Sequence, residues 1–127
     1  MATRAGAPSA LVLFAHGSRD AQWAEPFRAI QRRLAVRQPN LQVELAFLEL
    51  TPPTLAQTIE RLADAGHTRL TVAPLFMGQG AHVKRDLTDI VSRLRQRYPA
   101  LDLTLLPAAG EVDEVLDAIT NWLVRHA

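Results

Sequence analysis

The 127-residue chain is long enough for one domain with its own core, and 48% hydrophobic against 21% charged residues is typical of globular proteins. Fourteen basic and 13 acidic residues leave a net charge of +1, so no overall field indicates a nucleic-acid or membrane partner. Cysteine is absent, which excludes disulfides, thiolate nucleophiles and cysteine-ligated metal centres.

The N-terminal residues 1–9 lack the long apolar core of a signal peptide. No apolar run in the chain approaches the roughly 20 residues that span a bilayer. We therefore expect a cytoplasmic protein without a membrane partner. A single domain is expected over residues 1–127, with residues 1–8 irregular or disordered.

Strand-like and helix-like patterns alternate along the chain, beginning with an apolar run over about residues 10–15. Three further strands are expected over about residues 41–47, 69–76 and 101–105. Each strand precedes apolar side chains at helical spacing. The expected stripes are Trp23, Phe27, Ile30 and Leu34, then Leu55, Ile59 and Leu62, then Val83, Leu87, Ile90, Val91 and Leu94, and finally Val112, Val115, Leu116, Ile119 and Trp122.

This alternation predicts a parallel sheet, because parallel neighbours need a long crossover and a helix supplies it. We expect an α/β fold, a three-layer sandwich with a four-stranded parallel sheet in the order βαβαβαβα. Ser18 is expected to cap the first helix, and Thr51 to cap the second ahead of Pro52. Residues 30–41 resemble residues 90–101, 60 positions later, which aligns His16 with Phe76.

Two histidines follow strands at the same end of the expected sheet. His16 comes directly after the first strand, and His82 follows the third strand through the loop Gly78-Gln79-Gly80-Ala81. Ligands of parallel α/β sheets bind beyond the carboxyl ends of the strands, so both imidazoles are expected to face one crevice. Neutral imidazole is the commonest protein ligand for transition metals. The pair therefore indicates metal chemistry.

The glycines beside these histidines have two interpretations. Gly17 permits a tight turn or a close ligand approach in the segment His16-Gly17-Ser18-Arg19. Gly78 and Gly80 indicate unusual dihedral angles or a backbone that a ligand approaches closely. The alternative is that both segments are ordinary connections with solvated histidines.

Charged residues near the two histidines add candidate roles. Asp86 lies four residues after His82 and is placed to orient its imidazole, or else the two form an ordinary pair on a helix surface. Glu49 follows the second strand, as a proton acceptor, a metal ligand or a solvated edge residue. Three basic residues suit an anionic substrate, unless they are solvated helix starts: Arg19, Lys84 and Arg85.

Taken together, three segments resemble the short CbiX-type sirohydrochlorin chelatases, within the class II tetrapyrrole chelatases. They are Ala15-His16-Gly17-Ser18-Arg19, then Phe47-Leu48-Glu49 followed by Pro53, and Pro74-Leu75-Phe76 through Gly80 and His82 to Asp86. The resemblance implies a single chelatase-like domain and insertion of cobalt or iron into sirohydrochlorin, toward cobalamin or sirohaem. Some relatives handle nickel.

The resemblance also implies roles for particular residues. His16 and His82 would bind the metal and accept protons, with Glu49 assisting. Ser18, Arg19, Gly80, Lys84 and Arg85 would contact the tetrapyrrole, and Asp86 would support His82. The divalent metal is the substrate, and no organic cofactor is expected. Longer relatives hold the macrocycle between two tandem domains, so this chain is expected to form a homodimer.

Two rival functions use the same residues. A non-catalytic metal or tetrapyrrole carrier would use the same two histidines. A phosphate-handling enzyme would use His16 as a nucleophile, but Ala15 stands where histidine phosphatases have an arginine. For the chelatase we expect activity to fall below about pH 6, where imidazoles in general become protonated.

Overall fold

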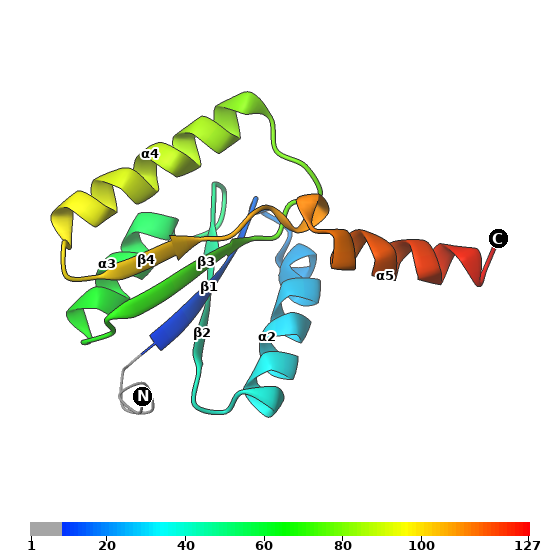
Figure 1. Ribbon diagram of the computed structural model, residues 1–127, viewed down its shortest axis with the longest axis horizontal. Coiled ribbons are helices and arrows are strands. Elements are labelled where there is room, and N and C mark those ends of the chain that lie inside the picture. The colour runs from blue at the N-terminus through cyan, green and yellow to red at the C-terminus, as the bar shows by residue number, and fades with distance from the viewer. Residues whose placement is uncertain (1–8) are drawn as a thin grey trace.

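A computed structural model describes residues 9–127; the expectation for residues 1–8 lies outside the described residues. Figure 1 shows four strands alternating with helices, as the sequence predicts. The elements in chain order are β1 (Ser9–Ala15), the 3-10 turn η1 (Ala21–Ala24), α2 (Glu25–Arg37), β2 (Gln42–Phe47), α3 (Leu55–Asp64), β3 (Arg69–Pro74), α4 (Ala81–Arg97), β4 (Asp102–Leu105), the 3-10 turn η2 (Ala109–Glu111) and α5 (Asp113–Val124).

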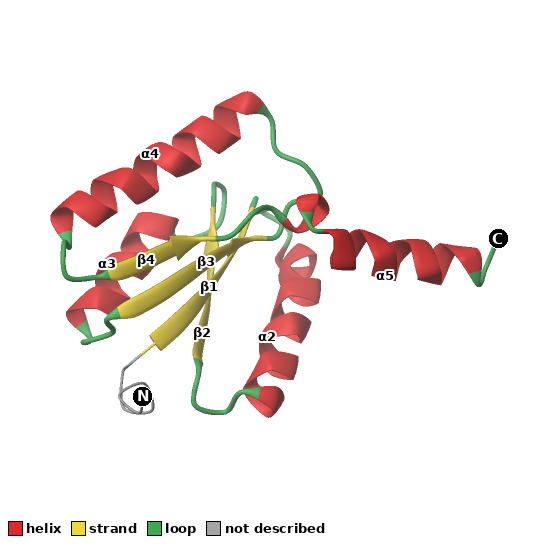
Figure 2. Ribbon diagram, in the orientation of Figure 1, coloured by secondary structure: helices red, strands yellow, loops and turns green. Residues whose placement is uncertain are grey.

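The strands form one parallel sheet in the order β2-β1-β3-β4. Within it, Leu13 of β1 pairs with Leu45 on one side and Ala73 on the other. Helices α3 and α4 cover one face of the sheet and α2 covers part of the other (Figure 2). The predicted α/β fold with a four-stranded parallel sheet is confirmed.

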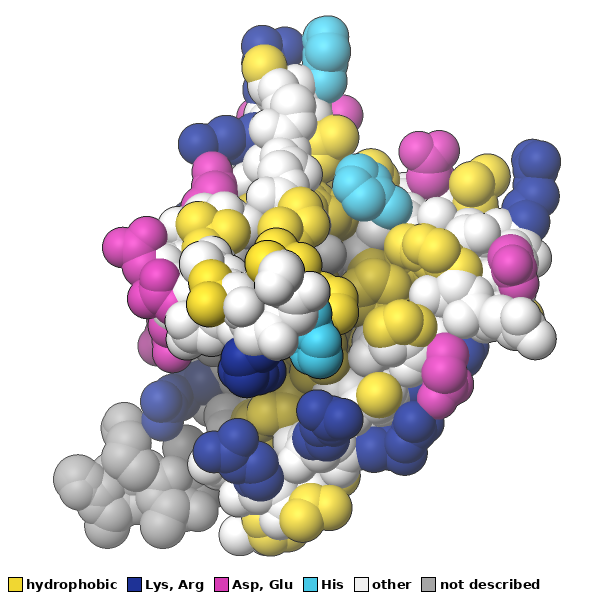
Figure 3. Space-filling view, turned by 90° about the vertical axis from the view of Figure 1, so that its right-hand side faces the viewer, with side chains coloured by type: hydrophobic (Ala, Val, Ile, Leu, Met, Phe, Trp, Pro, Cys, Tyr) yellow, Lys and Arg dark blue, Asp and Glu magenta, His cyan; other side chains and the backbone are white. Residues whose placement is uncertain are grey.

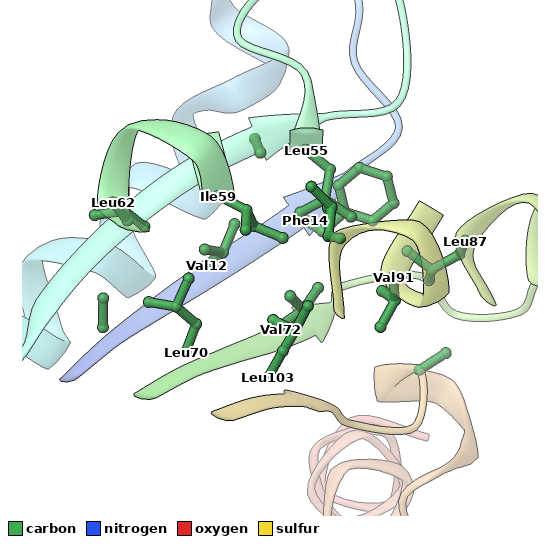
Figure 4. Close-up of a cluster of buried hydrophobic side chains, with 14 of the residues drawn as sticks. Val12, Phe14, Leu55, Ile59, Leu62, Leu70, Val72, Leu87, Val91 and Leu103 are labelled. Carbon is green, nitrogen blue, oxygen red and sulfur yellow. The ribbon is translucent and has the colours of Figure 1, made fainter. Parts of the chain in front are cut away.

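The main core lies between the sheet and the pair α3 and α4. Because successive strand side chains point to opposite faces, Val12 and Phe14 of β1 enter this core together with Val72 of β3. Figure 4 shows them meeting Ile59 of α3 and Val91 of α4. These five side chains are at most 1% exposed. Burial of each such side chain contributes roughly 1.5–3 kcal/mol, so this face stabilises the fold.

Two predicted helix caps are wrong. The N-cap of α3 is Thr54, whose hydroxyl accepts a hydrogen bond from the Gln57 backbone, while the Gln57 side chain bonds back to Thr54. Asp20, rather than Ser18, caps the first helical turn by accepting from the Gln22 backbone at 2.9 Å. In both cases another residue suited to capping lies two or three positions after the predicted one. The helix begins at the residue that makes the capping hydrogen bond.

The last helix forms where it was predicted but does not lie on its own sheet. In Figure 1, α5 extends away from the other elements. It has no buried residue, and among the elements within residues 9–127 its extensive contacts are with the preceding turn η2. No helix within residues 9–127 is long and apolar enough to cross a membrane.

Candidate functional site

His16 lies at the carboxyl end of β1, with its imidazole against a buried aromatic ring. Its ring centroid lies 4.2 Å from that of Phe76, and the two planes are 30° apart. Phe76 is 2% exposed and contacts Phe14 in a tilted pair with centroids 5.6 Å apart. The imidazole itself is exposed. The core therefore supports one face of an otherwise accessible ring.

Backbone pairing continues beyond the sheet and brings Glu49 to the same edge. The Leu48 amide donates to the Ala15 carbonyl at 2.9 Å, and the Glu49 amide donates to the His16 carbonyl at 3.0 Å. Gly17 has a φ of +99°, and a Cβ there would lie 1.8 Å from the Glu49 carbonyl oxygen. Only glycine fits this approach, so the tight-turn interpretation of Gly17 is confirmed. The Glu49 side chain is exposed.

Thr51 ties the two loops together. Its hydroxyl accepts from the Ser18 amide at 3.2 Å and donates to the Ser18 carbonyl. The Ser18 hydroxyl in turn accepts from the Asp20 amide at 3.0 Å. Between the loops, Leu50 has a φ of +67°, a left-handed conformation that costs a non-glycine residue on the order of 1–2 kcal/mol. Local strain and cross-loop bonds thus define the shape of this edge.

The loop after β3 leads from Phe76 to the start of α4. It is anchored by the Leu75 amide, which donates to the Phe14 carbonyl at 2.7 Å, and by the Gly110 amide, which donates to the Phe76 carbonyl at 2.9 Å. A Cβ on Gly110 would lie 1.5 Å from the Met77 carbonyl oxygen, so a side chain is excluded there. These contacts fix where α4 begins.

The expectation of unusual dihedral angles at Gly78 and Gly80 is wrong. Neither glycine has a positive φ, and Gly80 is the N-cap of α4 in an extended conformation. A Cβ on either would meet nothing within 4 Å. The two glycines border open space, and close approach by a ligand stays a prediction.

The predicted residues of α4 lie in its first two turns and are all exposed: His82, Lys84, Arg85 and Asp86. Within residues 9–127, no hydrogen bond or ion pair joins His82 to Asp86, so the orienting role of Asp86 stays a prediction. Arg19 is exposed beside His16 in sequence. In this part of the chain no three histidine, aspartate or glutamate side chains are grouped as a metal site.

His16 follows β1, and His82 lies in the first turn of α4, after the loop that follows the neighbouring parallel strand β3. Phe76 supports His16. Figure 3 views the molecule from the side on which α5 projects, and histidine side chains are exposed there among hydrophobic and basic ones. Imidazole ligands, a nearby carboxylate and several cations suit capture of a metal ion and an anionic molecule.

This arrangement agrees with the comparison to protein families, in which the CbiX model matches residues 10–125. The chain belongs to the CbiX family. The crystallised CbiX protein of Marinobacter aquaeolei is 28% identical, with a TM-score of 0.78 over 94% of this chain and 97% of that one. Both the fold and the length of this CbiX-family chain are therefore those of a solved relative.

Other relatives of this CbiX-family chain are longer. Sirohydrochlorin ferrochelatase of Priestia megaterium is 30% identical over 115 residues, which are 88% of this chain and 42% of that protein. Sirohydrochlorin chelatase SirB from Bacillus subtilis subspecies spizizenii, solved in complex with cobalt, is 26% identical with a TM-score of 0.74. That match covers 93% of this chain and 50% of SirB. The chain thus spans about half the length of these two relatives.

Sequence reasoning missed three residues that shape the edge of this CbiX-family domain: Phe76, Thr51 and Leu50. Of the three, only Phe76 could have been identified from the sequence. The 60-residue offset aligns it with His16, and equivalent positions after adjacent parallel strands lie side by side. Thr51 was assigned to a helix cap, and a strained leucine has no sequence signature.

Proposed function

We propose that this chain inserts a divalent metal, cobalt or iron, into sirohydrochlorin or a closely similar tetrapyrrole. The observation that carries the proposal is the placement of His16 and His82 on one edge of the sheet in a member of the CbiX family. Two of the relatives above carry sirohydrochlorin in their names, those of Priestia megaterium and Bacillus subtilis, and the latter was solved with cobalt. Nickel suits the same nitrogen and oxygen ligands.

The reaction exchanges one divalent cation for two pyrrole N–H protons. As the metal forms bonds to the ring nitrogens, its bonds to the protein break and two protons leave the macrocycle. Two neutral imidazoles, His16 and His82, hold the ion while leaving coordination positions open, unlike a closed four-ligand cage. The imidazoles and the Glu49 carboxylate are the groups available to accept the released protons.

Tetrapyrrole binding is assigned to the polar residues around this edge. The side chains of Arg19, Lys84 and Arg85 are exposed and would pair with the peripheral carboxylates of the macrocycle. The Ser18 turn and the open space at Gly80 would let the ring approach the backbone. Asp86, one turn beyond His82, would orient that imidazole once the metal binds.

We further propose that two copies of the chain form the working site, because the chain spans about half of the longer relatives. A second copy would supply the opposite wall of the cleft. The metal is a substrate in this scheme, and no organic cofactor takes part. We place the reaction in the cytoplasm, which fractionation of cells expressing the tagged protein would test.

The test is an insertion assay with purified protein, sirohydrochlorin and each of Co²⁺, Fe²⁺ and Ni²⁺, followed by the change in absorbance. We expect His16→Ala and His82→Ala to lose activity by about 10³-fold or more, as expected when metal-binding and proton-accepting groups are removed. His126→Ala is the matched control, since it removes an exposed histidine beyond the end of α5.

Circular dichroism of each variant shows whether an inactive variant has kept the wild-type fold. Wild-type turnover in both His16→Ala and His82→Ala would refute the assignment. Cobalt retained through gel filtration by wild-type protein that inserts none would favour a carrier instead.

A further inference from the structure

The two loops on either side of the His16 loop each carry a large apolar side chain that the fold leaves exposed. Leu50, in the loop after β2, is 54% exposed, and Met77, in the loop after β3, is 63% exposed. Other apolar residues of the same loops belong to the interior, since Leu48 packs against the main core and Phe76 is 2% exposed. Leu50 and Met77 thus stand apart from the core.

Leu50 is exposed on a strained backbone. It is the central residue of a three-residue turn, in which the Thr51 amide donates to the Glu49 carbonyl at 2.8 Å. With a φ of +67° at its centre, this is the rare, strained form of the γ-turn, and glycine or asparagine adopts such a φ more easily than leucine. Strained residues concentrate at sites that bind or transform a ligand. Strain and exposure together therefore indicate that the Leu50 side chain contacts a ligand.

The backbone at Met77 is fixed by its neighbours. The Phe76 carbonyl accepts from the Gly110 amide at 2.9 Å, and a Cβ on Gly110 would lie 1.5 Å from the Met77 carbonyl oxygen. The thioether side chain has three rotatable bonds and adapts to irregular apolar surfaces. A fixed backbone with an adaptable, exposed apolar side chain suits contact with a ligand.

Strand order places these two residues on either side of His16. The sheet runs β2-β1-β3, and the three residues follow these strands in turn: Leu50 after β2, His16 after β1 and Met77 after β3. Figure 1 shows the three loops at the same end of the sheet. Neighbouring strands lie about 4.8 Å apart, so the ends of β2 and β3 stand roughly 10 Å apart across β1. The edge therefore presents an imidazole flanked by two apolar groups, over a span that a tetrapyrrole ring can cover.

The arrangement matches the chemistry of such a macrocycle. A conjugated tetrapyrrole has apolar faces, and carboxylate substituents place negative charge at its rim. The cations assigned above to the substrate account for the rim and leave the apolar faces without a partner on the protein. Leu50 and Met77 supply apolar surface beside the imidazole that holds the metal, where the ring must arrive.

We propose that Leu50 and Met77 are substrate-positioning residues, which pack against the tetrapyrrole on both sides of His16 and hold its ring nitrogens over the bound metal. This role rests on the function proposed above and names how the apolar part of that substrate is recognised. Contact with the ring removes both side chains from water, and this gain offsets the strain at Leu50.

The first test is equilibrium binding of metal-free sirohydrochlorin to the full-length protein, followed by fluorescence. Leu50→Asn removes the apolar side chain and suits the positive φ, so its urea midpoint should equal or exceed that of wild type. Contact would bury the exposed half of a leucine side chain, so Leu50→Asn should raise Kd roughly 5- to 10-fold. Leu50→Met keeps an apolar side chain of similar size and should stay within about twofold of wild type.

A purely structural role for Leu50 predicts the opposite order. In that case Leu50→Asn would have a lower urea midpoint than wild type and an unchanged Kd for sirohydrochlorin, and this result would overturn the proposal.

Met77 is tested by a matched pair of substitutions in the same binding experiment. Met77→Ala should raise Kd roughly 5- to 10-fold, whereas Met77→Leu should stay within about twofold of wild type, because it conserves apolar volume. Val36→Ala is the control, since it removes an 82% exposed apolar side chain from the last turns of α2, and its Kd should not change. An equal rise in Kd for Val36→Ala would show that the effect is not specific to the edge.

Salt distinguishes an apolar contact from a charged one. Between roughly 0.05 and 0.5 M NaCl, the loss of affinity caused by Leu50→Asn should keep its size, whereas the loss caused by Arg19→Gln should shrink, because salt screens exposed charge pairs. A Leu50→Asn effect that disappears at high salt would contradict the apolar contact.

The binding experiment contains no metal, so its outcome is separate from that of the insertion assay. Wild-type Kd values in both Leu50→Asn and Met77→Ala, with insertion by wild-type protein, would reject the positioning roles and retain the chelatase. Weakened binding in both variants, with a wild-type protein that binds sirohydrochlorin but inserts no metal, would retain the positioning roles and reject the insertion activity.

Discussion

The interior beneath α3 and α4 and the carboxyl edge of the sheet differ in almost every physical respect. The interior is closed, apolar and built from side chains near zero exposure, such as Ile59 and Val72. The edge consists of exposed polar side chains on loops that backbone hydrogen bonds and one aromatic stack hold in place. Stability and the proposed chemistry therefore depend on different residues, and substitutions should separate the two.

Gly17 is the residue at which this separation should fail, with the largest effect on stability. An alanine there combines an unfavourable positive φ with a collision against the Glu49 carbonyl. We expect Gly17→Ala to lower the free energy of unfolding by about 3–5 kcal/mol and to reduce insertion.

Gly66 provides a matched control, because it has the same φ of +99° but open space around its Cβ. Gly66→Ala should cost only about 1–2 kcal/mol in urea unfolding. Equal losses for the two variants would show that the contact with Glu49 does not constrain the edge.

In the interior, Ile59→Ala should lower the free energy of unfolding by about 3 kcal/mol, because a fully buried side chain leaves a cavity. Insertion per folded molecule should stay at the wild-type rate, since Ile59 is part of the main core and not of the edge. A drop in specific activity of this variant, measured well below its unfolding temperature, would contradict the separation of stability from insertion.

The core and strands follow from the sequence because apolar periodicity reports directly on which side chains are buried. The parallel sheet and the position of both histidines follow in the same way. The helix caps do not, because Thr51 and Thr54 are both suitable residues and only the Gln57 partner distinguishes them. The position of α5 could not be predicted either, since an apolar stripe indicates burial without indicating which surface buries it.

Lowering the pH is expected to have a smaller effect on insertion. Metal binding requires neutral imidazole, so protons compete with the ion as pH falls through the range in which histidine side chains in general protonate, about pH 6–7. Insertion should fall between pH 7.5 and 5.5, by roughly tenfold for each imidazole that must be neutral, while the circular dichroism spectrum stays constant. Activity that rises steadily toward pH 5 would exclude imidazole as the metal-binding group.

The smallest effect should come from the cations at the start of α4. Lys84→Gln and Arg85→Gln each remove an exposed charge without a recorded ion pair among the described residues. Each should raise KM for sirohydrochlorin by up to roughly 5-fold and leave kcat nearly unchanged, because a surface charge pair contributes about 1 kcal/mol or less. Arg93→Gln, farther along α4, serves as the control.

The central claim is that His16 and His82 bind one metal ion, and X-ray absorption of the Co²⁺-loaded protein tests it most directly. The account predicts two imidazole ligands per cobalt in the wild type and one fewer in each of His16→Ala and His82→Ala. An unchanged imidazole count in both variants would contradict it.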